Sequence, residues 1–294
     1  MQKTLDLSIK KSETGTTKDG YSLNNGKSYE AYVSNQEWEM FVKDMEQNHP
    51  DAFDEYMAGS GGEMKPKGKY PPKMASYGSS SRMIYNLCKD IPKFHYEHQL
   101  PTKVGGIANL DGFIEKEDRY IFVEAKCREP YGAKSHIIEK KYRDLYQYID
   151  SDGSCNLNIR TENIDSKISV MFSVGKRIIT NFDIKQMICH LLGIAVKFLN
   201  NPTDKRISFL YLCYNPKLIE IIDDKKKANI YETYDQMSAE CHAIDFSNLF
   251  KSIVMYLSEQ LKVGMSTSED IHKMLDNFKF QLCDQNDYIN KIIT

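Results

Sequence analysis

NLDGFIEKEDRYIFVEAK, residues Asn109 to Lys126, is the stretch that decides the fold. Two mainly apolar runs, 110–114 and 120–125, flank the polar tetrapeptide 116–119. Short apolar runs separated by a few polar residues are typical of two antiparallel strands joined by a turn. We therefore expect a β-hairpin here, with the rest of a sheet built around it.

The position of the turn predicts which residues face each other across the hairpin. The expected pairs are Glu115 with Tyr120, Ile114 with Ile121, and Phe113 with Phe122. The same register sets Asp111 opposite Glu124. Directly opposed residues have Cβ atoms about 4.5–5.5 Å apart, and like charges at this separation destabilise the pair. A divalent cation between the two carboxylates would remove that repulsion.

Alternation along the second strand brings a lysine to the same face as the acids. Glu124 and Lys126 project the same way, about 6.6–6.8 Å apart along the strand, whereas Val123 and Ala125 point into the opposite layer. A pair of carboxylates with water in the remaining positions suits Mg²⁺. The lysine could orient or deprotonate a metal-bound water, or offset charge on a phosphate.

An acid two residues before a lysine is a weak signal by itself. The same spacing occurs at 63–65, 139–141, 165–167 and 183–185. The triplet Glu124 to Lys126 differs because it ends an apolar strand and has an acid in register on the partner strand. The alternative is an edge hairpin with solvated acids that Lys126 neutralises.

At Asp111, Glu124 and Lys126 the chain resembles the PD-(D/E)xK nuclease superfamily, the restriction-endonuclease-like phosphodiesterases. The family signature is an acid at the start of one strand and a (D/E)xK triplet at the end of the next. Family members often have proline before the first acid, where this chain has Leu110. The resemblance covers about residues 79–214. It implies an α/β protein with a restriction-endonuclease-like core, a mixed β-sheet flanked by helices, and helical N-terminal and C-terminal extensions.

The resemblance also implies a site. In that family the acids hold Mg²⁺, with Mn²⁺ as a substitute, and the lysine assists the attacking water. The implied metal ligands are Asp111, Glu124 and the backbone carbonyl of Ala125. In several branches a glutamine on the helix after the triplet approaches the scissile phosphate, which makes Gln186 a catalytic candidate; otherwise it is a surface amide. Glu97, in an expected strand at 94–100, is a further candidate acid.

Composition bounds the class of protein. The 294 residues are 41% hydrophobic and 27% charged, with a net charge of −2, so no overall positive field indicates nucleic acid. The seven cysteines occur singly, which favours a reducing compartment over a disulfide framework. The start of the chain lacks the apolar core of a signal peptide, and no apolar run reaches about 18 residues. We expect a cytoplasmic protein that does not enter a membrane.

The chain divides into three expected regions. Residues 1–75 form an N-terminal helical extension and a basic linker, with a capping box at Ser34 and Glu37 and a segment rich in Pro, Gly and Lys at 61–73. Residues 76–215 form the catalytic core, and residues 216–294 a helical region packed on it.

Patterning places further elements within these regions. The core is expected to contain a strand at 94–100, a helix at 135–150, a loop at 150–165, a strand at 168–174, a helix capped by Asn181 or Asp183, and a strand at 207–214. The C-terminal region is expected to contain helices at 229–244, 247–261 and 268–278. Alternation puts His95 and His98 on opposite faces of their strand, which favours structural roles for both.

These observations predict a Mg²⁺-dependent phosphodiesterase that acts on nucleic acid. Within this class they favour a restriction-like endonuclease of double-stranded DNA. Two rivals remain open. One is a nucleic-acid-binding or assembly protein that keeps the fold without turnover. The other is a hydrolase of small phosphoesters, which the acidic isoelectric point near 6.4 favours. The sequence also leaves open RNA as substrate, exonuclease action and a homodimer.

Overall fold

The computed structural model describes residues 33, 35–59, 63–66, 72–76, 78–127, 137–218, 224–263 and 267–287. Ser34 of the expected capping box and much of the expected linker at 61–73 lie outside these residues. Among the helices that are described, none has the length and apolarity needed to cross a lipid bilayer.

A five-stranded sheet forms the centre of the molecule. It consists of β1 (His95–Pro101), β2 (Ile107–Glu115), β3 (Arg119–Lys126), β8 (Arg206–Cys213) and β9 (Phe278–Cys283), in that order. The first three strands are antiparallel, whereas β8 runs parallel to β3 and β9 parallel to β8. The sheet is therefore mixed, and the chain has the α/β class that the sequence predicts.

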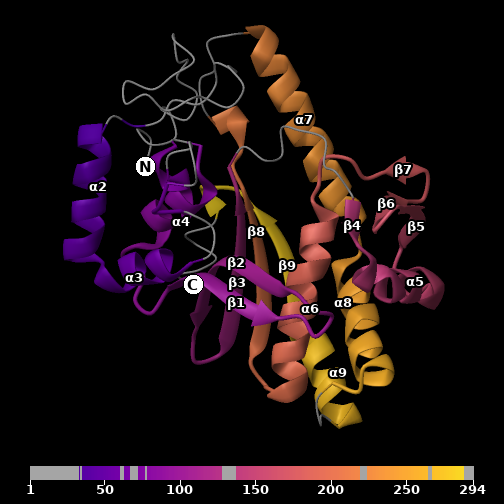
Figure 1. Cartoon of the computed structure of the whole chain (residues 1–294). Helices are drawn as coiled ribbons and strands as arrows, with labels where there is room; N and C mark the ends of the chain where they lie inside the picture. The colour runs from indigo at the N-terminus through magenta and orange to yellow at the C-terminus, as the bar shows by residue number, and fades with distance from the viewer. Residues whose placement is uncertain are drawn as a thin grey trace.

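Helices cover both faces of this sheet. The helices α2 (Asn35–Asn48), α3 (Pro50–Ala58) and α4 (Ser80–Cys88) lie on one side, and α6 (Ile184–Asn200) and α8 (Phe246–Met255) on the other (Figure 1). A short 3₁₀ turn, η3 (Lys73–Ala75), precedes α4. Ser79 caps α4 by accepting a hydrogen bond from Arg82 N at 3.2 Å, so this helix begins within the serine cluster 79–81.

A second, four-stranded antiparallel sheet is inserted between β3 and α6. It contains β4 (Ile137–Glu139), β5 (Leu157–Ile164), β6 (Lys167–Val174) and β7 (Arg177–Ile178). The strand expected at 168–174 is confirmed as β6, but the loop expected at 150–165 is wrong because it contains β5. Only two β5 side chains, Leu157 and Ile159, are buried, so the segment lacks the apolar character that predicts a strand.

The helix expected at 135–150 begins later than predicted. The first residues described there form β4 and the 3₁₀ turn η5 (Lys140–Tyr142), and α5 (Arg143–Asp152) follows. Pairing of β4 with β6 accounts for the difference, since this long-range contact overrides the local helical pattern.

The C-terminal region is mainly helical but contributes one strand to the central sheet. Its helical segments are η6 (Pro216–Leu218), α7 (Asp224–Ala243), α8, the π-helical η7 (Tyr256–Gln260) and α9 (Ser268–Asn277). The helices expected at 229–244, 247–261 and 268–278 are confirmed, but the sequence pattern missed β9, which follows α9 directly and pairs with β8.

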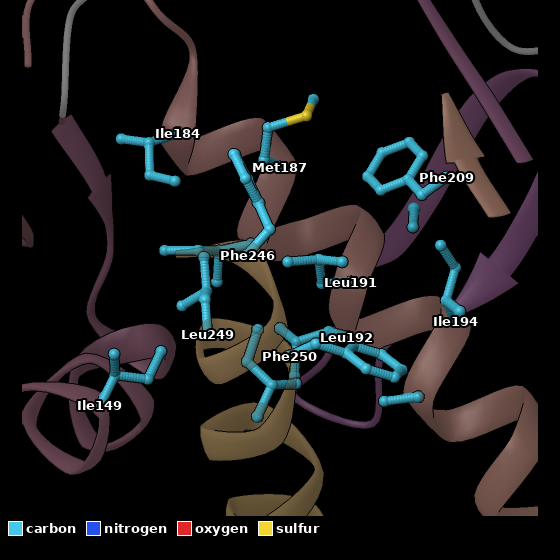
Figure 2. Close-up of a cluster of buried hydrophobic side chains, with 14 of the residues drawn as sticks. Ile149, Ile184, Met187, Leu191, Leu192, Ile194, Phe209, Phe246, Leu249 and Phe250 are labelled. Atoms are coloured by element: carbon cyan, nitrogen blue, oxygen red, sulfur yellow. The ribbon is translucent and has the colours of Figure 1, made fainter. Parts of the chain in front are cut away.

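The larger of two buried cores lies between the sheet and α6. Its residues in Figure 2 include Ile184, Met187, Leu191 and Leu192 of α6, Phe246, Leu249 and Phe250 of α8, and Phe209 of β8. Gly193 allows close packing, since a Cβ there would lie 2.8 Å from Leu100 Cβ and 2.9 Å from Ala108 Cβ. The α6 backbone is therefore held against β1 and β2, which sets where the start of the helix lies.

Strand β1 departs from regular alternation at Glu97, which has a φ of 50°. The rings of His95 and His98 both stack on Phe113, at centroid distances of 6.2 and 4.3 Å. The expectation that these histidines lie on opposite faces is therefore wrong. The left-handed backbone at Glu97 is the cause, because it shifts the alternation by one residue.

Candidate active site

The hairpin register is confirmed close to the turn, and the paired ladder ends before the acids. Glu115 pairs with Tyr120, Ile114 with Ile121, Phe113 with Phe122, and Gly112 with Val123. The ladder then ends, and Asp111 Oδ2 accepts a hydrogen bond from Ala125 N at 2.7 Å. The sequence predicts a ladder pair between Asp111 and Glu124, and the structure does not have it. The carboxylate of Asp111 nevertheless lies beside the Glu124 to Lys126 triplet.

Gly112 permits the packing next to Asp111. A Cβ on Gly112 would lie 2.3 Å from Phe94 Cζ, so the aromatic ring occupies the space that a side chain would need. The N–H and C=O groups of one strand residue point towards the same neighbouring strand. Since Ala125 N points to Asp111, the carbonyl of Ala125 faces the same side.

Glu124 is the most buried of the candidate acids, with 2% of its surface exposed. Lys126 Nζ lies 2.6 Å from Glu124 Oε1, and Gln186 Nε2 donates to the same oxygen at 2.7 Å. His190 Nε2 lies 2.9 Å from the other oxygen, Oε2. Among the described residues neither Oε2 nor Nε2 makes a well-aligned hydrogen bond, although the contact with His190 lowers the pKa of Glu124.

The charges of the two acids on β2 and β3 are coupled. Burial alone would raise the pKa of Glu124, but the Lys126 ammonium and His190 hold that pKa at about 2. Burial and the charge of Glu124 raise the pKa of Asp111 well above its usual value, with Lys126 opposing this shift. Glu124 is thus ionised at neutral pH, and a second negative charge on Asp111 is disfavoured.

Two further acids extend this cluster. Burial and the charge of Glu63 raise the pKa of Glu97 to about 7. Glu97 is partly buried, and its charge also acts on Asp111. Glu63 is 4% exposed and forms an ion pair with Lys73, Nζ to Oε1 at 2.7 Å. Glu97, whose backbone has a positive φ, is therefore close enough to other acids for their charges to affect its pKa. Strained backbone of this kind is common at functional sites.

The position of Gln186 and His190 depends on the start of α6. Asp183 caps the helix by accepting a hydrogen bond from Gln186 N at 3.1 Å. The preceding residues 180–182 are held by Glu240 of α7, which is 1% exposed. Its carboxylate accepts four hydrogen bonds, from Thr180 N and Oγ1 at 3.0 Å and from Asn181 N and Phe182 N at 2.8 Å.

The structure brings together most residues that the sequence singles out. Asp111, Glu124, Lys126 and Gln186 lie in one cluster, and Glu97 is coupled to it electrostatically. The sequence pattern does not point to Glu63 or to His190. The available signal for His190 is its position four residues after Gln186, which places both on one face of a helix.

The donors that converge here suit a hard divalent cation. Asp111, Glu124 and the carbonyl of Ala125 offer oxygen ligands, which Mg²⁺ prefers, and water would complete its shell. The raised pKa of Asp111 reflects burial and, after it, repulsion from Glu124, which a cation would relieve. Within the described ranges, however, no group of three or more His, Cys, Asp and Glu side chains is arranged to hold a metal ion. The fit therefore depends on the carbonyl and on water.

A groove of about 420 Å³ lies elsewhere, at the opposite end of β3 and β8. Its lining residues are Arg119, Arg206, Ser208, Leu210, Asp276, Asn277, Phe278, Lys279 and Gln281. Arg119 is five strand positions from Glu124, or about 17 Å along β3. The groove shares no residue with the acidic cluster.

Comparison of the chain with protein-family models, curated proteins and solved structures gives no match. The functional assignment therefore depends on the site itself.

Proposed function

We propose that this protein is a Mg²⁺-dependent phosphodiesterase that cleaves nucleic acid, as a restriction-like endonuclease of double-stranded DNA. The observation that carries the proposal is the convergence of Asp111, Glu124, Lys126 and Gln186 from two neighbouring strands and one helix. These are the residue types that phosphodiester hydrolysis requires: oxygen ligands, a cation beside them, and an amide donor.

Each residue has a distinct role in this proposal. Asp111, Glu124 and the Ala125 carbonyl would hold the cation, which when bound supplies an activated water and neutralises phosphate charge. Lys126 keeps Glu124 ionised and places an ammonium where negative charge develops on the phosphate. Gln186 donates one amide hydrogen to Glu124, and its second hydrogen is suited to a phosphate oxygen.

One observation favours a second candidate, a nucleic-acid-binding protein of the same class without turnover. Glu124 already has a lysine and a glutamine on Oε1 and a histidine at Oε2. A buried acid with such partners is stable without a cation. The two candidates make opposite predictions for metal-dependent cleavage.

The test is cleavage of supercoiled plasmid and of a linear duplex with Mg²⁺, Mn²⁺ or EDTA. We expect nicking or linearisation by the wild type with Mg²⁺, and none with EDTA or in Lys126→Ala. Lys205→Ala is the matched control, because Lys205 pairs with the exposed Glu115 on the same hairpin, Nζ to Oε1 at 2.6 Å, and should leave cleavage unchanged. DNA binding without cleavage in any of these metals would favour the second candidate.

Salt dependence separates a nucleic acid substrate from a small phosphoester. A protein that contacts several backbone phosphates loses affinity steeply as salt rises, because binding releases counterions. We expect such a slope for duplex DNA. A flat slope together with hydrolysis of a chromogenic phosphodiester would instead indicate a small substrate.

A further inference from the structure

His190 is the contact of Glu124 that the proposed chemistry does not use. The ring is 2% exposed, and its Nε2 lies 2.9 Å from Glu124 Oε2. In the part of the chain that the structure describes, Nδ1 has no hydrogen-bond partner, and Nε2 has only the imperfectly aligned carboxylate of Glu124. A buried polar atom without a partner is costly and calls for an explanation.

From this contact we infer that His190 is a positioning residue, which holds the carboxylate plane of Glu124 in the orientation that binds a divalent cation. The inference rests on the proposed function, because it concerns the same acid. An apolar side chain at position 190 would fill the space without unpaired nitrogens. A histidine at this buried position is explained if its contact with Glu124 is needed to orient the carboxylate.

The geometry supports an indirect role. The terminal torsion of a glutamate has a broad energy profile, so contacts on one oxygen leave the carboxylate plane poorly fixed. Lys126 and Gln186 both approach Oε1, and only the histidine approaches Oε2 among the contacts that the structure describes. With His190 present, the plane is held from both sides.

The ring itself is held in place by its surroundings. It meets the Phe209 ring edge to face, with centroids 6.0 Å apart and an interplanar angle of 89°. Gln186 lies one helical turn earlier on the same face of α6. Because Nε2 faces Glu124 and Nδ1 is buried, His190 acts through Glu124 and does not itself reach a ligand.

The test is direct titration of the full-length protein with Mg²⁺ and Mn²⁺ by calorimetry, with thermal melting as a second readout. In His190→Leu, which has similar volume and no donor, we expect affinity for the cation to fall about 10–100-fold, as when other residues that orient a metal ligand are lost. In His190→Gln, whose amide can reach Oε2, affinity should stay within a few-fold of wild type.

The possible results separate the two proposals. Wild-type affinity in a folded His190→Leu would overturn the positioning role and leave the proposed function intact. No cation binding by the wild type would overturn both. If His190→Leu does not fold, His190→Asn replaces it, because this shorter amide does not reach Oε2; equal affinity in the Asn and Gln variants would also overturn the inference.

Discussion

The two ends of β3 carry the same kinds of charge in opposite surroundings. At its start, Asp118 is half exposed and contacts Arg119 and Arg206 on the surface. At its end, Glu124 and Lys126 form a pair whose side chains are 2% and 9% exposed. Both acids have a depressed pKa of about 2, but Asp118 owes this to hydrogen bonds from Arg119 and Arg206, whereas Glu124 reaches it against burial.

The difference shows which of the two pairs needs an explanation. Exposed ion pairs contribute little to stability. The pair of Asp118 and Arg206 therefore needs no functional explanation, because it forms where the hairpin turn meets the start of β8. Taking two charges out of water is costly, and an apolar pair is often equally stable in their place. A buried acid and lysine at the end of an apolar strand are therefore a sign of function.

The largest expected effect is that of Lys126→Ala. Removing one partner of a buried pair leaves an uncompensated charge and costs about 3–5 kcal/mol. We expect the free energy of unfolding measured with urea at pH 7 to fall by about this amount, together with the loss of cleavage. A stable variant with wild-type cleavage would show that the pair is neither buried in solution nor catalytic.

A second acid, buried without a lysine, sharpens the comparison. Glu240 is 1% exposed and accepts four hydrogen bonds from residues 180–182. Glu240→Ala leaves these donors unpaired, and we expect a loss of about 2–4 kcal/mol in unfolding free energy. Because residues 180–182 lead into α6, hydrogen exchange at the start of that helix should increase. Unchanged hydrogen exchange at the start of α6 would show that Glu240 does not help to position Gln186.

Glu97 should show the opposite pH dependence to a paired acid. Burial and Glu63 raise its pKa from 4.5 to about 7, so the folded protein binds more protons than the unfolded chain between these values, and stability falls as pH rises through this window. Glu97→Gln removes the cost. We expect it to stabilise the protein at pH 8 by at most about 3 kcal/mol and to have little effect at pH 4. Thermal melts at both pH values measure this, and equal shifts would contradict a raised pKa.

The smallest effect is expected at the surface pair. Asp118→Asn should leave the melting temperature at pH 7 within experimental error, because the side chains of Asp118 and its partner Arg206 are 50% and 58% exposed to water. Cleavage should also be unchanged. A loss comparable to that in Lys126→Ala would erase the distinction between the two ends of β3.

The hairpin could be predicted from sequence because its information is local. A short polar turn between two apolar runs is enough to pair Phe113 with Phe122, and alternation then places Glu124 and Lys126 on one face. The change at Asp111 could not be predicted in this way. The neighbouring Gly112 packs against Phe94, which precedes β1, and this contact comes from a distant part of the chain.

The missed features are those set by distant parts of the chain. Strand β9 exists because β8 pairs with it, although FKFQLC follows a helix directly. His190 lies off the main apolar stripe of α6 and is nevertheless buried, because Glu124 provides a polar partner. Local patterning contains neither contact, which is why the fold class was easier to predict than the surroundings of the acids.

The insertion between β3 and β8 has a consequence for the order of assembly. The β2–β3 pairing is local and can form quickly, whereas Gln186 meets Glu124 from a position 62 residues later in the chain. During synthesis the acids emerge from the ribosome well before α6 does. We therefore expect nascent chains that end before Ile184 to lack the Gln186 and His190 contacts of Glu124, so that the proposed activity would arise only after translation has passed the second sheet.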